Sequence, residues 1–107
     1  MPTLQEVNVT NPPLHADAPD TRQRLQAAQD DWRAQLHLPV WCITVDPSDF
    51  PGQYVARLHL SSSHALYVTS MAVVGHTLEA VRAVLPENLV RIPRSETDDP
   101  KIAECWL

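Results

Sequence analysis

The chain contains the stretch Gln53-Tyr54-Val55-Ala56-Arg57-Leu58-His59-Leu60, which has the most regular alternation of apolar and polar side chains in the sequence. Successive side chains of a β-strand point to opposite sides of a sheet. One side of this strand would be apolar and carry Tyr54, Ala56, Leu58 and Leu60. The other side would be mixed and carry Val55, Arg57 and His59. The pattern therefore predicts a strand from Gln53 to Leu60 that separates a core face from a second, more polar face.

Two further strands flank this one. Residues 40–45 are rich in β-branched and aromatic side chains, and residues 46–52 combine Asp, Pro, Ser and Gly as turns do. After a polar loop at residues 61–65, residues 66–74 form a third apolar run. Three consecutive strands with short loops predict an antiparallel meander.

Two helices are expected, one before and one after these strands in the sequence. The first begins at Asp20 or Thr21 as the capping residue and ends before Pro39. Its apolar stripe consists of Leu25, Ala28, Trp32 and Leu36. The second helix is capped by Thr77 and ends at Pro86. Its stripe consists of Leu78, Val81, Val84 and Leu85.

The whole pattern predicts one α+β domain over residues 20–107, preceded by an arm at residues 1–19. The arm has scattered apolar positions and four prolines, so we expect it to be flexible or extended. Two short strands follow the second helix, at residues 89–92 and 102–107. The expected order is an N-terminal helix, a three-stranded antiparallel meander, a second helix and two further short strands (α-β-β-β-α-β-β), in a chain short enough for a single core.

Composition excludes several classes of function. The 107 residues include 13 acidic and 8 basic side chains, which give a formal charge of −5. An acidic chain with scattered arginines disfavours direct nucleic-acid binding. No apolar run approaches the roughly 18 residues of a membrane span, so membrane spanning is excluded as well. Residues 1–6 carry no secretory signal, which leads us to expect a cytoplasmic protein.

The sequence offers no cofactor or metal motif. Cys42 and Cys105 match neither a CxxC pair nor a zinc site, so we expect buried thiols in a reducing compartment, with a disulfide between them left open. The chain has only two glycines, which excludes phosphate-cradling and dinucleotide-binding loops. Five histidines lie near element ends without metal-ligand spacing. We therefore expect neither a metal nor a cofactor.

Pairing the three central strands assigns the two faces of the meander. The apolar face would consist of Trp41, Ile43, Val45, Tyr54, Ala56, Leu58, Leu60, Leu66 and Val68. The mixed face would consist of Val40, Cys42, Thr44, Val55, Arg57, His59, Tyr67, Thr69 and Met71. Arg57, His59 and Tyr67 would make the mixed face a binding platform. Alternatively, the first helix covers that face and leaves Arg57 and His59 at its edge.

A third interpretation of the mixed face is catalysis by Cys42. A thiol beside Arg57 or His59 would have a lowered pKa and become nucleophilic. The chain shows no third orienting group and no glycine loop for an oxyanion hole. We therefore expect a protein without catalytic activity.

Two other surfaces are candidates for contact. Asp30-Asp31 and Asp98-Asp99 could form an acidic surface that meets an arginine-rich partner. The last strand, which includes Trp106, could leave unpaired backbone for strand addition.

These observations lead to two hypotheses. The first is a non-catalytic protein-binding module, either a homodimer or a small accessory or inhibitor protein. A mobile-element or phage protein that acts on a host nucleic-acid-processing protein would be one example. The alternative is a small-molecule binder or minor enzyme with a pocket on the Cys42, Arg57, His59 and Tyr67 face.

Overall fold

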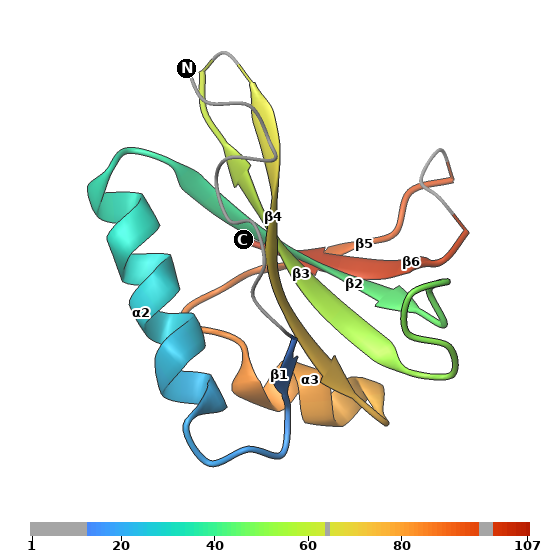
Figure 1. Cartoon of the computed structure of the whole chain (residues 1–107). Coiled ribbons are helices and arrows are strands. Elements are labelled where there is room, and N and C mark those ends of the chain that lie inside the picture. The colour runs from blue at the N-terminus through green and yellow to red at the C-terminus, as the bar shows by residue number, and fades with distance from the viewer. Residues whose placement is uncertain (1–12, 64, 97–99) are drawn as a thin grey trace.

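A computed structural model describes residues 13–63, 65–96 and 100–107, and in these residues two helices pack on a six-stranded sheet (Figure 1). The strands are β1 (Leu14–His15), β2 (Leu38–Val45), β3 (Tyr54–Ser61), β4 (Leu66–Gly75), β5 (Arg91–Pro93) and β6 (Ile102–Trp106), and the helices are α2 (Thr21–Ala34) and α3 (Leu78–Val84). The order across the sheet is β1-β4-β3-β2-β6-β5. The α+β class is confirmed, whereas the expected order of elements is matched only in part because a strand precedes the first helix.

That additional strand, β1, lies in the segment expected to be an arm. Residues 1–12 of the arm are outside the described residues. Leu14 and His15 pair in parallel with Val73 and Val74 of β4. The Thr21 hydroxyl at the start of α2 donates to the carbonyl oxygen of His15 at 2.6 Å. The described end of the arm is therefore part of the sheet and fixes the entry into α2.

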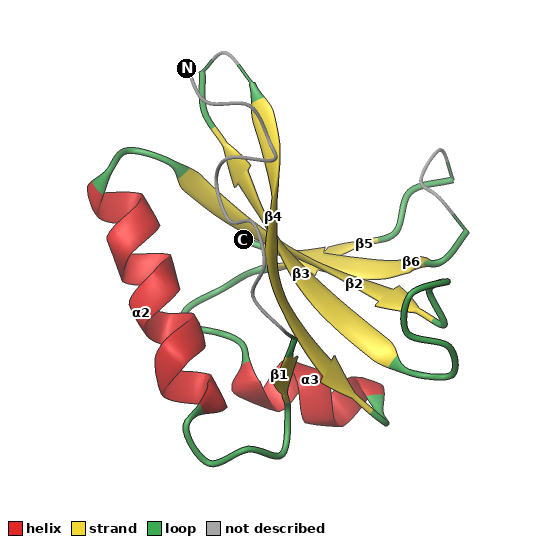
Figure 2. Cartoon of the chain, viewed as in Figure 1, coloured by secondary structure: helices red, strands yellow, loops and turns green. Residues whose placement is uncertain are grey.

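Both helices lie on the same side of the sheet (Figure 2). Leu25 of α2 and Val81 of α3 are fully buried in one cluster with Trp41 of β2. The indole nitrogen of Trp41 donates to the side-chain oxygen of Gln29 on α2 at 2.8 Å, so the buried polar atom of the ring is paired. The alternative in which the first helix covers the mixed face is therefore wrong.

The ends of the helices follow their capping residues. Thr77 accepts a hydrogen bond from the backbone N–H of Ala80 at 3.0 Å, which confirms it as the cap of α3. Asp20 is the N-cap of α2 but makes no side-chain capping bond. Leu36 lies beyond the end of α2 with φ of 64° and is 90% exposed, so its inclusion in the buried stripe was wrong.

The register of β4 differs from the one expected. Tyr67 pairs with Leu60, and Val73 pairs with Ala56, so the odd-numbered residues of β4 share the core face. A bulge between these pairs places three residues of β4 opposite Leu58 and leaves the alternation in phase on both sides. A shift of one residue turns every side chain of a strand to the other face. Tyr67, Thr69 and Met71 therefore lie on or toward the covered side of the sheet, where Tyr67 is buried and Met71 packs on the core.

The last two strands form one border of the sheet. β6 pairs with β2 on one side and with β5 on the other, so the expected free edge at residues 103–107 was wrong. Val90 and Leu107 exchange both backbone hydrogen bonds, at 2.7 and 3.1 Å. The alternation of an antiparallel pair then turns the N–H and C=O of Arg91 outward. Pro93, which has no N–H, follows on the same side, so the edge of β5 offers little for strand addition.

A buried carboxylate joins β6 to α3. Glu104 is 1% exposed, and its oxygens accept hydrogen bonds from the guanidinium groups of Arg82 and Arg91 and from the indole N–H of Trp106. These donors, led by Arg82, lower the pKa of Glu104 from 4.5 to about 2. The carboxylate therefore stays charged inside the protein because its charge is fully paired.

Candidate functional site

The second face of the sheet, opposite α2 and α3, carries the candidate site. We call it the open face, because no helix of the described residues packs on it. β2 contributes Leu38, Val40, Cys42 and Thr44, which pair with residues of β3 that include Arg57 and His59. Cys105 of β6 and Ile92 of β5 continue the same face toward the border of the sheet.

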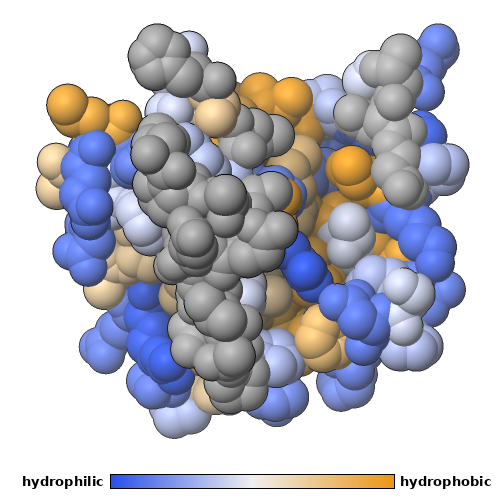
Figure 3. All heavy atoms as spheres, turned by 45° about the horizontal axis from the view of Figure 1, so that its top comes forward, coloured by the Kyte–Doolittle hydropathy of each residue, from blue (hydrophilic) through white to orange (hydrophobic). Residues whose placement is uncertain are grey.

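The open face is divided into two parts. At one end Val55, Ala72 and Val74 are buried and packed against Phe50 of the turn between β2 and β3. At the other end Leu38 of β2 and Ile92 of β5 instead remain exposed, as do Val90, directly before β5, and Leu107, directly after β6. Because side chains alternate along a strand, Val90 lies on the same face as Ile92, and Leu107 on the same face as Cys105. In the space-filling view, hydrophobic atoms reach the surface at the upper left and to the right of the grey atoms, and hydrophilic atoms lie along the lower and right borders (Figure 3).

Between these two parts lies a hollow of about 410 Å³. Its lining comes from β2, β3, β6 and the turn after β2, and consists of Cys42, Thr44, Pro47, Ser48, Asp49, Arg57, His59 and Ile102. The turn is ordered by Asp46, whose carboxylate accepts the N–H of Gly52 at 2.7 Å. Gly52 has φ of 74°, a conformation that a residue without a side chain adopts at least cost. This turn folds back over the sheet and forms one wall of the hollow.

Two charged side chains line the hollow, and they are paired with each other. Arg57 donates to the carboxylate of Asp49 at 2.9 Å, and its side chain is about one-third exposed. One guanidinium carries five N–H donors, so this bond leaves donors for another acceptor. The pair keeps the hollow close to neutral while leaving a cation within it.

His59 adds a titratable group. Burial lowers its pKa from 6.5, and the charge of Arg57 acts in the same direction. Its Nδ1 lies 3.2 Å from the carbonyl oxygen of Arg57, a geometry in which Nδ1 carries the proton and donates. The imidazole is then neutral at pH 7, and Nε2 is the nitrogen with a free lone pair.

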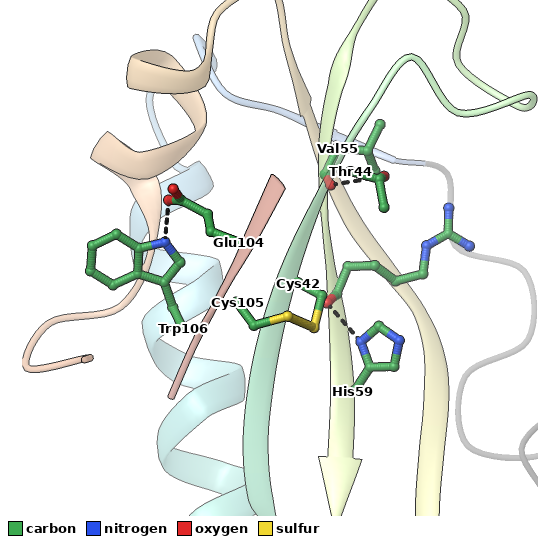
Figure 4. The surroundings of a disulfide bond; sticks show 8 residues. Cys42, Thr44, Val55, His59, Glu104, Cys105 and Trp106 are labelled. Atoms are coloured by element: carbon green, nitrogen blue, oxygen red, sulfur yellow. Dashed lines mark hydrogen bonds between the residues drawn. A yellow bond between two sulfur atoms is a disulfide. The ribbon is translucent and has the colours of Figure 1, made fainter. Parts of the chain in front are cut away.

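Cys42 and Cys105 form a disulfide across β2 and β6 (Figure 4). They are paired in register with a Cα–Cα distance of 4.1 Å, as residues on one face of adjacent strands are. The described part of the chain contains no free cysteine. The disulfide that the sequence left open is therefore formed in place of the two buried thiols expected, and Cys42 has no thiol to be activated in this state.

Of the five residues predicted to bind a partner, the structure brings three together. Cys42, Arg57 and His59 line the hollow. Tyr67 pairs with Leu60 and therefore lies on the covered face. Trp106 pairs with Trp41 and donates to Glu104, so its ring belongs to the covered side as well.

The acidic residues lie elsewhere. Asp30 and Asp31 are exposed on α2, on the side of the molecule away from the open face, and Gln26 donates to Asp30 at 3.1 Å. Asp98 and Asp99 lie outside the described residues. Asp30 and Asp31, the described part of the predicted acidic surface, are thus on the opposite side of the sheet from the hollow.

Sequence reasoning missed two paired acidic residues, Asp49 in the hollow and Glu104 on the covered side of the sheet. Asp49 was assigned only to a turn, although an acidic turn before a strand that carries Arg57 was a signal for the ion pair. Glu104 is the only charged residue of the last strand, flanked by apolar neighbours, and this isolation was the available signal that it is paired inside.

Several other types of site find no support in the described residues. No three His, Cys, Asp or Glu side chains come together there as a metal ion would require. None of the described helices is both long enough and apolar enough to cross a bilayer. No family model matches the sequence, and neither a curated protein nor a solved structure matches it. The function is therefore inferred from the geometry of the chain itself.

Proposed function

We propose that this chain is a non-catalytic protein-binding module whose contact surface is the open face. One observation carries the proposal: four large hydrophobic side chains on the open face remain exposed. They are Leu38 at 39%, Val90 at 64%, Ile92 at 44% and Leu107 at 38%. Contiguous apolar groups on a sheet face are a common basis of protein contact, since their burial is favourable by roughly 25 cal/mol per Å².

The partner that we propose first is a second copy of the chain. Two sheets pack face to face through apolar side chains at about 10 Å, with their strands nearly aligned. A two-fold interface brings each residue near its own counterpart, so like charges would repel. On the open face Arg57 is neutralised by Asp49, and His59 is neutral, so this repulsion is small.

Such a dimer would present its helices outward. Asp30 and Asp31 lie on the side away from the open face, so both copies would expose them to a third molecule. An accessory or inhibitor role toward an arginine-rich, nucleic-acid-processing protein fits this arrangement, because opposite charge speeds encounter. Direct nucleic-acid binding stays outside the proposal.

The dimer is tested by light scattering over a range of protein concentrations. Wild type should approach twice the mass of the monomer, and Ile92→Asp should weaken association at least tenfold, about 1.4 kcal/mol. Ala27→Asp is the control, because Ala27 is an exposed apolar residue of α2, the helix on the other side of the sheet. A monomer at all concentrations, or equal effects of the two variants, would refute this partner.

A cytoplasmic location belongs to the same proposal, and the disulfide makes it testable. Disulfides persist in oxidising compartments and are reduced in most cytosols. Trapping free thiols with an alkylating agent before cell lysis reports the state of Cys42 and Cys105 in place. Labelled thiols would agree with a cytoplasmic protein, whereas an intact disulfide would argue for an oxidising location.

The hollow favours a second candidate function, binding of a small molecule. Its volume of about 410 Å³ falls in the range of small-molecule sites. Its polar groups converge from two strands and a turn, as such sites require. Shifts of the His59 and Arg57 side-chain NMR signals during titration with small carboxylates would test this candidate.

A further inference from the structure

The disulfide and the two basic side chains of the hollow stand in an order that suits one reaction. Across the sheet, Cys105 is on β6, Cys42 on β2, and Arg57 and His59 on β3. A line from the sulfur of Cys105 through that of Cys42 therefore continues over β3. Figure 4 shows the His59 ring beyond Cys42 on the side away from Cys105.

This order matters because each sulfur of a disulfide is attacked from one direction. An attacking thiolate approaches a sulfur in line with the bond that breaks, opposite the leaving sulfur. For attack on Cys42 that approach lies within the hollow, which Cys42 lines. We propose that the hollow is a thiol–disulfide exchange site, at which a small thiol that carries a carboxylate attacks Cys42. This inference rests on the second candidate function, ligand binding in the hollow.

Arg57 selects the class of thiol. Its guanidinium has donors left after the bond to Asp49, and it directly opposes Cys42 in the pairing of β2 and β3. Arginine binds carboxylates through two parallel N–H donors. A thiol whose carboxylate sits on Arg57 would hold its sulfur near Cys42.

His59 supplies the base. It lies diagonal to Cys42 across β2 and β3, and its Nε2 is available when Nδ1 donates to the carbonyl of Arg57. The thiolate is the form that attacks a disulfide, and a free thiol is mostly protonated at pH 7. Proton transfer to Nε2 would therefore raise the fraction of the bound thiol that can react. The charged groups that share the hollow with His59 are Arg57 on its own strand and Asp49 on the turn.

The exchange consists of two attacks. The bound thiol gives its proton to His59, and its sulfur bonds to that of Cys42 while the Cys42–Cys105 bond breaks. Cys105 leaves with the electron pair as a thiolate and takes up, through solvent, the proton that His59 releases. A second thiol molecule then loses its proton to solvent and attacks the mixed disulfide at the small-molecule sulfur. This attack releases a small disulfide, and Cys42 leaves with the electron pair and takes up that proton from solvent. Two thiols are oxidised, and the disulfide of the protein is reduced.

The test measures how fast different thiols open the disulfide of the full chain. The probes are 3-mercaptopropionate and the neutral 2-mercaptoethanol, each rate being divided by its rate with a small reference disulfide. Wild type should prefer the carboxylate thiol by about fivefold, as expected for a partly exposed ion pair. Arg57→Gln should abolish this preference, because the neutral amide no longer pairs with the carboxylate of the thiol.

Two further variants test whether the thiol preference is specific to Arg57 and whether His59 acts as the base. Arg33→Gln removes an exposed arginine on α2 and should leave the preference unchanged. His59→Gln should slow both thiols by about tenfold at pH 7, since a base contributes at least that much when it is removed. The dependence of the His59→Gln rate on pH should then follow only the ionisation of the attacking thiol.

The outcomes distinguish exchange from binding. Glutarate, a dicarboxylate without sulfur, should shift the NMR signals of His59 and Arg57 if the hollow binds carboxylates. Shifts without a thiol preference would overturn the exchange site and leave ligand binding standing. Absence of both would overturn the two together, and an equal preference in wild type and Arg57→Gln would refute the role given to Arg57.

Discussion

The two faces of the sheet are built from the same strands and differ in what covers them. On the covered face, Trp41, Ile43 and Leu58 are fully buried beneath α2 and α3. On the open face of the same strands lie a disulfide, an ion pair, a histidine and exposed hydrophobic side chains. Alternation within the same strands thus gives a small chain one face that is covered by helices and one face with exposed hydrophobic side chains.

The covered face should account for most of the stability. Leu58→Ala deletes buried groups there and should lower the free energy of unfolding by about 4 kcal/mol, since the cavity left behind adds to the lost burial. Leu36→Ala makes the same chemical change at an exposed site and should cost less than about 0.5 kcal/mol. Urea denaturation of both variants measures the contrast, and equal losses would break the distinction between the faces.

The disulfide should be the main contribution of the open face to stability. Cys42 and Cys105 are 63 residues apart, and cross-linking them restricts the unfolded chain. Its loss should lower the free energy of unfolding by about 3 kcal/mol. Urea denaturation with and without reductant gives this value. The double variant Cys42→Ser with Cys105→Ser serves as the control, because reductant should leave it unaffected.

Glu104 should make the covered side sensitive to acid. Its pKa is about 2 in the folded state and 4.5 ordinarily, so its pairing stabilises the fold above pH 4.5 and is lost as the pH falls toward 2. The loss over this window should be about 2 to 3 kcal/mol, since Arg82 is partly exposed and screened. The difference in unfolding free energy between wild type and Glu104→Gln should shrink across the same window. A constant difference would show that Glu104 is not paired as described.

The exposed hydrophobic side chains should contribute least to the stability of the monomer. Ile92→Asp and Val90→Asp should each change the free energy of unfolding by less than about 0.5 kcal/mol at concentrations where the chain is monomeric. Urea denaturation of the dilute protein checks this value. A loss above about 2 kcal/mol would mean that these side chains are buried in the monomer, and the open face would then be part of the core.

The sequence predicted which side chains share a face best for strands in which one face is apolar and the other is polar. In β3 the alternation of Arg57 and His59 with Leu58 and Leu60 defines both sides, and the structure confirms it. In β4 the residues on both sides are largely apolar, so nothing in the pattern favours one phase. The turn between β3 and β4, closed by the bond from the N–H of Ser62 to the carbonyl of Ala65, decides the register and turns Tyr67 inward.

The remaining differences depend on contacts between distant parts of the chain. The disulfide depends on β6 pairing with β2, which no local pattern around Cys42 or Cys105 specifies. The position of α2 was ambiguous because both faces offered apolar side chains, and the bond between Trp41 and Gln29 on the covered side could not be predicted. Arg57 and His59 were found because their polarity interrupts a local period, whereas the pairing of Arg57 with Asp49 required the folded turn.

The most direct test of the central claim, that the open face is the working surface, is the dependence of backbone amide NMR signals on protein concentration. The amides of Val40, Ile92 and Leu107 should shift as the protein is concentrated, while those of Arg24 and Asp31 on α2 stay constant. Shifts confined to α2, or signals that do not change on either face, would contradict the account.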